Sequence, residues 1–296
     1  MSQKQNNRVQ EFFSVRFRKL LSGAPDGNPP WLDVIAGGEG GGLYLPTDAP
    51  WVIHRDFGTL VGGIRALLVQ ALHPATLAGV MNHSRYEKEP LGRLAGTIRW
   101  LTVTTFGSTA AVHAEASRVN RMHTRVAGEN PVPYRAADPH LLLWVHIAFM
   151  DSFLQAHEQF CVAPIPGGAD AYVKQWGRSV QPLGLSEVPR SLKELDVLME
   201  RFQGELVFNE NTANVVRFIK NPPLPAAVKP VYSLLFKAAV VSLRQEHREL
   251  LGLSVRFPKL VIASTRFALK GIRVLIGPES PIEDGAIRRL KNFELI

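Results

Sequence analysis

The sequence predicts an all-α protein built as a single multi-helix domain. Apolar residues recur at helical spacing along most of the 296 residues, and 46% of the chain is hydrophobic, which supports a sizeable core. Proline and N-cap residues mark several helix starts. Alternating strand patterns are scarce, and the chain shows no β-α-β rhythm.

The first 50 residues are predicted to differ from the rest. Residues 9–21 alternate apolar with basic side chains, which is typical of a short amphipathic helix. From 23 to 50 the chain is dense in Gly and Pro, with the runs GAPDGNPP and GGEGGG, so we expect no regular element there. We therefore predict a wrapping segment over 1–50 and an all-α domain over 51–296 that carries the chemistry.

Four long helices are expected between residues 55 and 180. The range 58–80 is apolar nearly all round, which indicates a buried helix. Pro90 can open the next helix, which ends near Phe106, and a third runs from Thr109 to about Gly128. A fourth begins with Asp138 as N-cap and Pro139 in the first position, and ends before the PIPGG break at 164–168. Further helices are predicted near 191–202, 205–219, 224–251 and 255–276.

Composition narrows the class of protein. The single cysteine, Cys161, excludes a disulfide scaffold and a thiolate-rich metal site. No apolar run reaches the ~18–20 residues of a transmembrane helix, and the polar, basic N-terminus does not look like a secretory signal, so we expect a cytoplasmic location. The net charge is +8, but the chain has no nucleic-acid-binding motif, so nucleic acid is not an expected partner.

Eight of the nine histidines lie between His54 and His157, on the span of the apolar helices. Histidine is the commonest metal ligand and general base in proteins. The motifs HExxH, CxxC and paired Glu-x-x-His are absent, and carboxylates are few here, so a di-metal carboxylate site is poorly supplied. Haem brings four ligands of its own and needs only one histidine from the protein, which suits this span better.

Two positions stand out by their spacing. Arg93 and Thr97 are four residues apart among small or apolar neighbours, where an arginine is costly unless it pairs with an anion or faces a polar cavity. The alternative is a surface arginine beside a threonine. His123 lies near the end of its helix, either as a ligand or as a residue stabilised by the helix dipole. His146 belongs to a stripe with Met150, and such a stripe favours core packing over a cofactor wall.

Five pieces of the chain between Leu67 and Phe153 occur in a recognisable order and spacing: LVQALHPATLAGVMNHS, RLAGT, TFG, RVNRMHTRVAG and YRAADPHLLLWVHIAFMDS. This region resembles the catalytic domain shared by rubber oxygenases (latex clearing proteins) and MpaB-like oxygenases. The resemblance implies a globin-like all-α core around one b-type haem, with dioxygen as co-substrate.

The resemblance also implies roles for individual residues. It makes His123 the proximal iron ligand and places Arg93 and Thr97 on the distal side. Apart from the resemblance, His73 precedes Pro74 and is either a distal base or a helix-kink residue, and His113 and His146, with Arg93, are further candidate cofactor contacts.

The chain departs from the rubber-cleaving branch at two places. It has Gly96 where rubber oxygenases carry a lysine that coordinates iron, and 72–80 contains His73 but no carboxylate where they carry a glutamate. We therefore expect an open iron position opposite His123.

These observations predict a haem-dependent oxygenase that acts on an apolar small molecule or a lipid-like substrate. The first alternative is a non-catalytic haem or lipid carrier at a membrane face. The second is an oxidoreductase that holds a non-haem metal on the clustered histidines.

The segment 256–273 adds a separate signal. Its basic residues cover one helix face of about 100°, and no acid occurs between Leu250 and Gly277. These residues are Arg256, Lys259, Arg266, Lys270 and Arg273. One interpretation is a docked helix with a solvated basic face, and the other is a peripheral contact with an anionic membrane surface.

Overall fold

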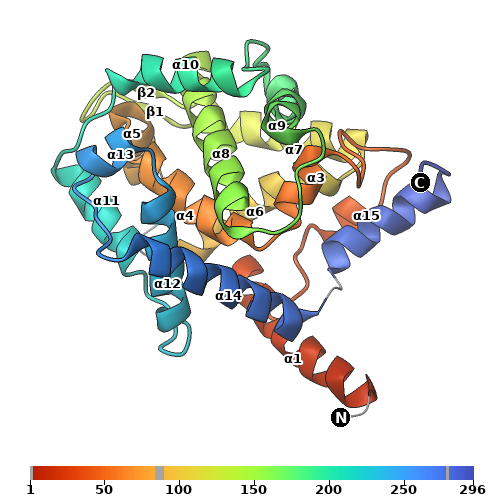
Figure 1. Cartoon of the computed structure of the whole chain (residues 1–296). Helices are drawn as coiled ribbons and strands as arrows, with labels where there is room; N and C mark the ends of the chain where they lie inside the picture. Colours follow the sequence, from red (N-terminus) through yellow and green to blue (C-terminus); the bar gives the residue numbers. More distant parts are fainter. Residues whose placement is uncertain (1–2, 84–89, 278–279) are drawn as a thin grey trace.

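The protein is all-α, as predicted. The computed structural model describes residues 3–83, 90–277 and 280–296, and for 3–9, 21 and 90–94 it describes the backbone only. Within those ranges the chain forms fifteen α-helices, one 3-10 helix and one pair of two-residue strands (Figure 1).

The elements are α1 (Gln3–Ser22), α2 (Leu32–Ala36), α3 (Ala49–His54), α4 (Gly58–Gln70), α5 (Pro74–His83), α6 (Pro90–Phe106), α7 (Thr109–His123), β1 (Ala127–Gly128), β2 (Tyr134–Arg135), α8 (Pro139–Phe160), α9 (Gly168–Trp176), η1 (Gly177–Leu183), α10 (Leu192–Gln203), α11 (Glu210–Lys220), α12 (Lys229–Ser242), α13 (Gln245–Leu250), α14 (Pro258–Ile276) and α15 (Pro281–Asn292).

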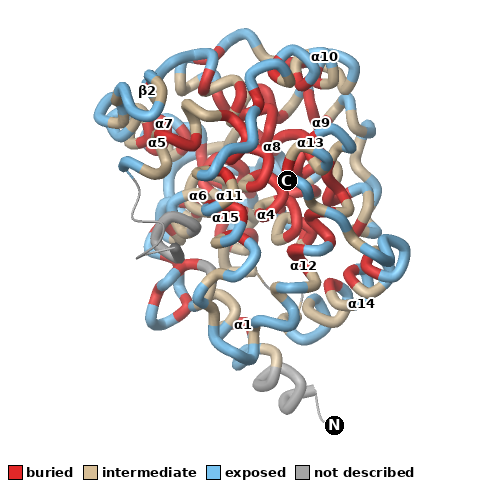
Figure 2. Tube along the Cα trace, turned by 90° about the vertical axis from the view of Figure 1, so that its left-hand side faces the viewer, coloured by how far each residue is buried: buried red, intermediate tan, exposed pale blue. Residues whose placement is uncertain are grey.

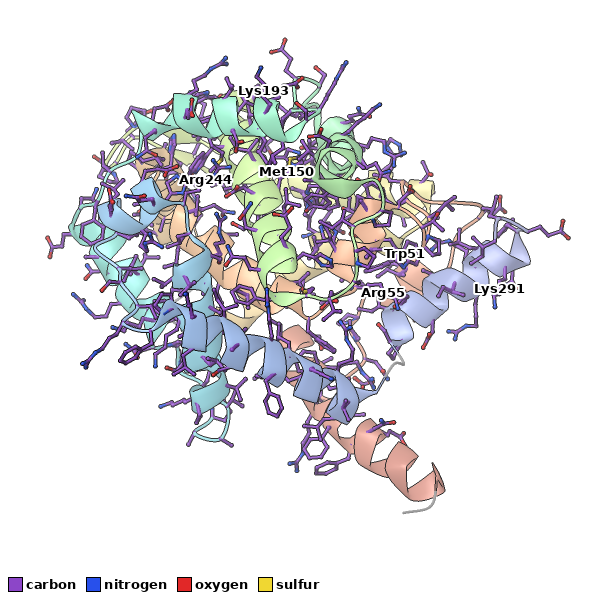
Figure 3. The ribbon with its side chains drawn as sticks, in the orientation of Figure 1. Trp51, Arg55, Met150, Lys193, Arg244 and Lys291 are labelled. Carbon is purple, nitrogen blue, oxygen red and sulfur yellow. The ribbon has the colours of Figure 1, made fainter. Side chains whose placement is uncertain are left out.

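The core is centred on α4 and α8, which pack against each other over much of their length. α12 covers α4, and α14 lies against both α12 and α8. The buried residues gather around α8 and α4 in the middle of the molecule (Figure 2). Met150 lies on α8 at this centre, whereas Lys193 and Lys291 project from the periphery (Figure 3).

The Gly/Pro-rich stretch is more regular than expected, because it contains α2 and the start of α3. Burial explains both helices: Trp31 and Ile35 anchor α2, and Trp51 anchors α3. Trp51 Nε1 donates to Glu283 Oε1 at 2.9 Å, and α2 packs against α15, so the segment after α1 is held by the last helix of the chain. The expectation of no regular element over 23–50 was therefore wrong, while the division at residue 50 stays a prediction.

The single helix predicted over 58–80 is two helices, α4 and α5, bent by 105°. Pro74 has no N–H to donate to the next helical hydrogen bond of α4, and it begins α5 instead. Within the described residues, no single helix is long and apolar enough to cross a membrane, and only this bent pair meets the length and composition test when taken together.

Three other predicted boundaries were wrong. The range 224–251 divides into α12 and α13 because Leu243 is extended, which lets Arg244 reach Asp151 at 2.8 Å. α7 ends at His123, since Ala127 and Gly128 pair with β2. The helix predicted over 205–219 begins only at Glu210, where Asn209 caps α11. The predicted break at PIPGG is confirmed, and α9 follows it from Gly168.

Candidate functional site

The adjacent helices α6 and α7 carry three of the site residues predicted from the sequence, namely Arg93 and Thr97 on α6 and His123 on α7. Ser108 caps α7 by accepting from Ala111 N at 3.3 Å. Glu115 of α7 is buried and accepts from Arg99 Nε of α6 at 2.9 Å and from Arg118 Nη2 at 2.6 Å. Burial raises the pKa of Glu115, but the two guanidiniums outweigh it and hold that pKa below its usual range. The Arg99–Glu115 pair ties α6 to α7 near the middle of each helix.

His123 is the last residue of α7 and is half-buried. Its Nδ1 is buried and has no hydrogen-bond partner among the described residues. Burial lowers the pKa of His123, so its ring is neutral at pH 7. Haem iron would be held by a neutral imidazole, which is the form that burial favours for His123. The chain therefore fits the cofactor in this respect.

The predicted distal residues lie on α6. The side chain of Arg93 falls outside the described part of the chain, and Thr97 is half-buried. Gly96 is exposed, and a Cβ added there would meet no atom within 4 Å. The distal roles of Arg93 and Thr97 stay predictions.

His73 lies at the α4–α5 corner and is buried. Its Nε2 is 3.2 Å from Glu205 Oε2, and His140 Nε2 is 2.9 Å from both oxygens of the same carboxylate. His73, a predicted catalytic residue, thus belongs to a His–Glu–His cluster with residues from α8 and from the turn after α10. The sequence contained no motif that joined Glu205 to these histidines.

The two remaining cofactor candidates lie in different surroundings. His146 is in the core, where its Nε2 has no partner among the described residues and burial lowers its pKa to about 3. His113 is exposed, and its ring makes no hydrogen bond or ring contact within the described part of the chain. The stripe of His146, Met150, Phe153 and His157 is buried throughout, as predicted for core packing.

A second group of possible metal ligands joins Asp56, His157 and Cys161. Each is already engaged or in the wrong protonation state. His157 Nε2 lies 2.8 Å from the Ala163 carbonyl, Asp56 pairs with Arg273, and burial raises the pKa of the Cys161 thiol well above its usual range. This group is therefore less suited to a metal than the His73 cluster.

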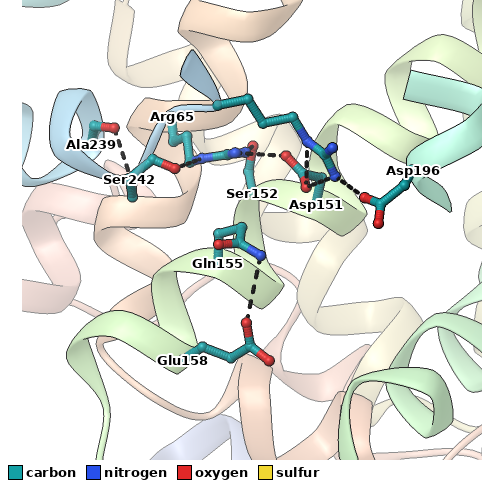
Figure 4. A network of polar contacts seen from close by, with 9 residues as sticks. Arg65, Asp151, Ser152, Gln155, Glu158, Asp196, Ala239 and Ser242 are labelled. Atoms are coloured by element: carbon teal, nitrogen blue, oxygen red, sulfur yellow. Dashed lines mark hydrogen bonds and ion pairs between the residues drawn. The ribbon is translucent and has the colours of Figure 1, made fainter. Parts of the chain in front are cut away.

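A buried ion network was not anticipated. Arg65 of α4 pairs with Asp151 of α8 at 2.6 Å, and Arg244 joins Asp151 to Asp196 (Figure 4). The signal was present, since Arg65 and Asp151 interrupt otherwise apolar helices. Because both lie in the α4–α8 interface, we assign this network to stability.

A pocket of about 320 Å³ lies between α11 and α12. Its lining includes Lys220, Tyr232, Phe236 and Lys237, and no predicted site residue.

The exposed face of α14 differs from the purely basic face that the sequence suggested. Leu260, Phe267 and Val274 form an exposed apolar row, and Phe267 is 80% exposed. α1 packs beside α14, with Gln10 Nε2 donating to Val274 O at 3.0 Å. We call this the α1/α14 surface, and its members are Phe12, Phe13, Arg16, Arg256, Phe257, Lys259, Leu260, Phe267, Lys270, Val274 and Leu275.

Two basic residues of α14 are not free for a partner. Arg266 Nε donates to Gln159 O at 2.8 Å, and Arg273 pairs with Asp56. Of the five predicted basic residues, Arg256, Lys259 and Lys270 remain toward solvent.

The five sequence pieces that resemble an oxygenase catalytic domain lie on the segment from α4 to α8. Residues 51–274 match the family model described as "ER-bound oxygenase mpaB/B'/Rubber oxygenase, catalytic domain". The chain therefore belongs to this family, and the resemblance is confirmed. Comparison with curated proteins and with solved structures found no match.

Proposed function

We propose that the protein is a haem-dependent oxygenase for an apolar or lipid-like substrate, with His123 as the iron ligand. The observation that carries this proposal is the position of His123, a partly buried histidine with a lowered pKa at the end of α7, inside the region that matches the oxygenase family. The family supports dioxygen chemistry, and haem b supplies a site where dioxygen binds and is activated.

The chain's own residues have separate tasks in this proposal. His123 holds the iron and keeps its imidazole neutral through burial. Arg93 and Thr97 would orient and polarise dioxygen or a substrate carbonyl, and such donors act mainly on groups that gain charge during reaction. His73 is the predicted distal base, but its Nε2 already faces Glu205 at 3.2 Å, so we assign it no proton-transfer step here.

The test is the haem content and absorption spectrum of the purified protein. His123→Ala should abolish stoichiometric haem binding, while His83→Ala, an exposed histidine of α5, should retain it. Normal haem content in His123→Ala would refute the assignment.

Activity measurements separate the alternatives. A haem carrier would show a Soret band without oxygen-dependent turnover, and a non-haem metal oxidoreductase would show no Soret band. For the oxygenase, Arg93→Ala and Thr97→Ala should lower turnover more than haem content. If Arg93→Ala loses haem first, Arg93 serves a propionate instead.

We also propose that the enzyme contacts an anionic membrane surface through the α1/α14 surface. Exposed Phe267 and Leu260 supply apolar insertion beside Lys259 and Lys270, and α14 contains no acidic residue. A lipid-like substrate would reach a protein docked in this way without crossing water. The corresponding location is the cytoplasm, with the protein bound peripherally to a membrane.

Sedimentation with vesicles tests this contact. Binding should require anionic lipid, weaken with salt, and fall in Phe267→Ser and Lys270→Glu. Val197→Ser, an exposed valine of α10, is the matched control and should bind normally. Absence of binding at low salt, or a dimer disrupted by Phe267→Ser in solution, would contradict the membrane proposal.

A further inference from the structure

Three potential metal ligands converge where three distant segments meet. His73 comes from the α4–α5 corner, His140 from the first turn of α8, and Glu205 from the turn after α10. One ligand atom of each lies within 4.8 Å of the other two. Both histidines present the same nitrogen, Nε2, to the carboxylate, at 3.2 Å for His73 and 2.9 Å for His140.

The surrounding core holds both rings in place. The His140 ring stacks on Phe202 with centroids 4.5 Å apart, and the His73 ring lies 5.9 Å from the ring of Trp144. The backbone is fixed as well, since Asp138 accepts from His140 N at 2.9 Å. The ligands are therefore oriented before any ion arrives, which lowers the cost of ordering them.

The two distances from imidazole nitrogen to carboxylate oxygen are close to those between neighbouring ligands of a transition metal, and the two imidazole nitrogens lie within 4.8 Å of each other. With metal–ligand bonds of about 2.0–2.2 Å, adjacent ligand atoms lie roughly 3 Å apart.

We infer that His73, His140 and Glu205 bind one divalent transition-metal ion of the Zn²⁺ or Fe²⁺ type. Two imidazoles and one carboxylate suit these ions better than Ca²⁺ or Mg²⁺, which prefer oxygen ligands. The side chains of His140 and Glu205 are 47% and 41% exposed, so the remaining coordination positions face solvent. The ion ties α8 to the turn after α10 and leaves room for water. This site does not include His123, and it does not rest on the proposed haem.

Zn²⁺ titration of the full chain tests the inference. After treatment with a chelator, which does not extract haem iron, the protein should bind one Zn²⁺ per chain near neutral pH by calorimetry. Glu205→Gln and His140→Ala should each weaken binding by at least about tenfold. Glu210→Gln, an exposed glutamate five residues further along the chain, is the matched control and should bind as the unaltered protein does.

A fluorescence measurement requires no change to the ligands. Cu²⁺ at this site should quench the emission of Trp144, and Trp144→Phe should remove that quenching while keeping Zn²⁺ binding. Absence of Zn²⁺ binding in excess metal would overturn the inference, as would binding that is unchanged in both Glu205→Gln and His140→Ala. Haem content does not enter either measurement, so failure here and failure of the proposed oxygenase are distinguishable.

Discussion

Arg65 and Asp151 form an ion pair that joins the two central helices, with Nη2 and Oδ2 2.6 Å apart and neither side chain exposed. Arg65 also donates to the Ser242 carbonyl at 2.9 Å and to Ser152 Oγ at 2.8 Å. Burial alone would raise the pKa of Asp151, but Arg65 and Arg244 outweigh it and lower that pKa. The carboxylate is therefore ionised throughout the neutral range, and its charge is matched inside the core.

Removing one member of the Arg65–Asp151 pair should destabilise the protein, because the other charge stays buried without a counterion. Asp151→Ala leaves Arg65 charged and unpaired, so we expect the free energy of unfolding to fall by about 3–5 kcal/mol. Asp196→Ala removes only the outer carboxylate, which is 44% exposed, and should cost less than about 1 kcal/mol. Denaturant unfolding followed by circular dichroism measures both. Equal losses in the two variants would show that the buried pair contributes no more to the free energy of unfolding than the exposed one.

His247 should make the protein sensitive to acid. Its side chain is fully buried, and burial, with a smaller effect of Arg65, lowers its pKa from 6.5 to about 4. As the pH falls from 6.5 toward 4, the unfolded chain protonates this ring and the folded chain does not, so stability decreases. The loss is about 1.4 kcal/mol per pH unit at most.

His247→Leu should reduce the slope of the unfolding free energy against pH by the equivalent of about one bound proton, because leucine does not titrate. The measurement is the free energy of unfolding against pH between the two pKa values. An unchanged slope would mean that His247 is protonated in the folded protein. The buried His54 and His146, whose pKa values are lowered to about 3, should maintain the residual slope.

Local signals in the sequence predicted much of the helical fold. Asp138 and Pro139 marked the start of α8 correctly, since a side-chain cap and a proline act within one turn. The bend between α4 and α5 was missed because the apolar pattern continues across it, although Pro74 marked the break. α2 was missed because its stability comes from burial of Ile35 against distant residues.

The candidate site was only partly predictable, because local patterns do not show which distant segments pack together. His123 was found through a short motif whose residues are close in sequence. The pairing of His73 with Glu205 depends on how α10 packs against α8, which periodicity does not encode. The exposed apolar row of α14 was likewise hidden, since the pattern alone did not show which apolar residues the core would cover.

Asp138 caps the first turn of α8, which carries His140, one of the three metal ligands we infer. Its Oδ1 accepts from His140 N, so Asp138→Ala should lower the free energy of unfolding by about 1 kcal/mol. The same change should weaken Zn²⁺ binding, since His140 then lies in a frayed turn. Asp138→Asn keeps the cap and should restore both properties. If Asp138→Ala and Asp138→Asn behave alike, the cap is not what holds this turn.

Two adjacent glycines of α4 offer a direct test of the central helix contact. A Cβ on Gly62 would lie 2.7 Å from Phe153 Cδ1 and 3.1 Å from the Ser152 carbonyl, so Gly62→Ala must push α4 away from α8. We expect a loss of about 1–3 kcal/mol in the free energy of unfolding. A Cβ on Gly63 meets nothing within 4 Å, so Gly63→Ala should instead stabilise the protein by about 0.5–1 kcal/mol through helix propensity. Thermal and denaturant unfolding of the two variants should move in opposite directions, and a shift in the same direction would show that α4 and α8 do not pack as closely as this geometry requires.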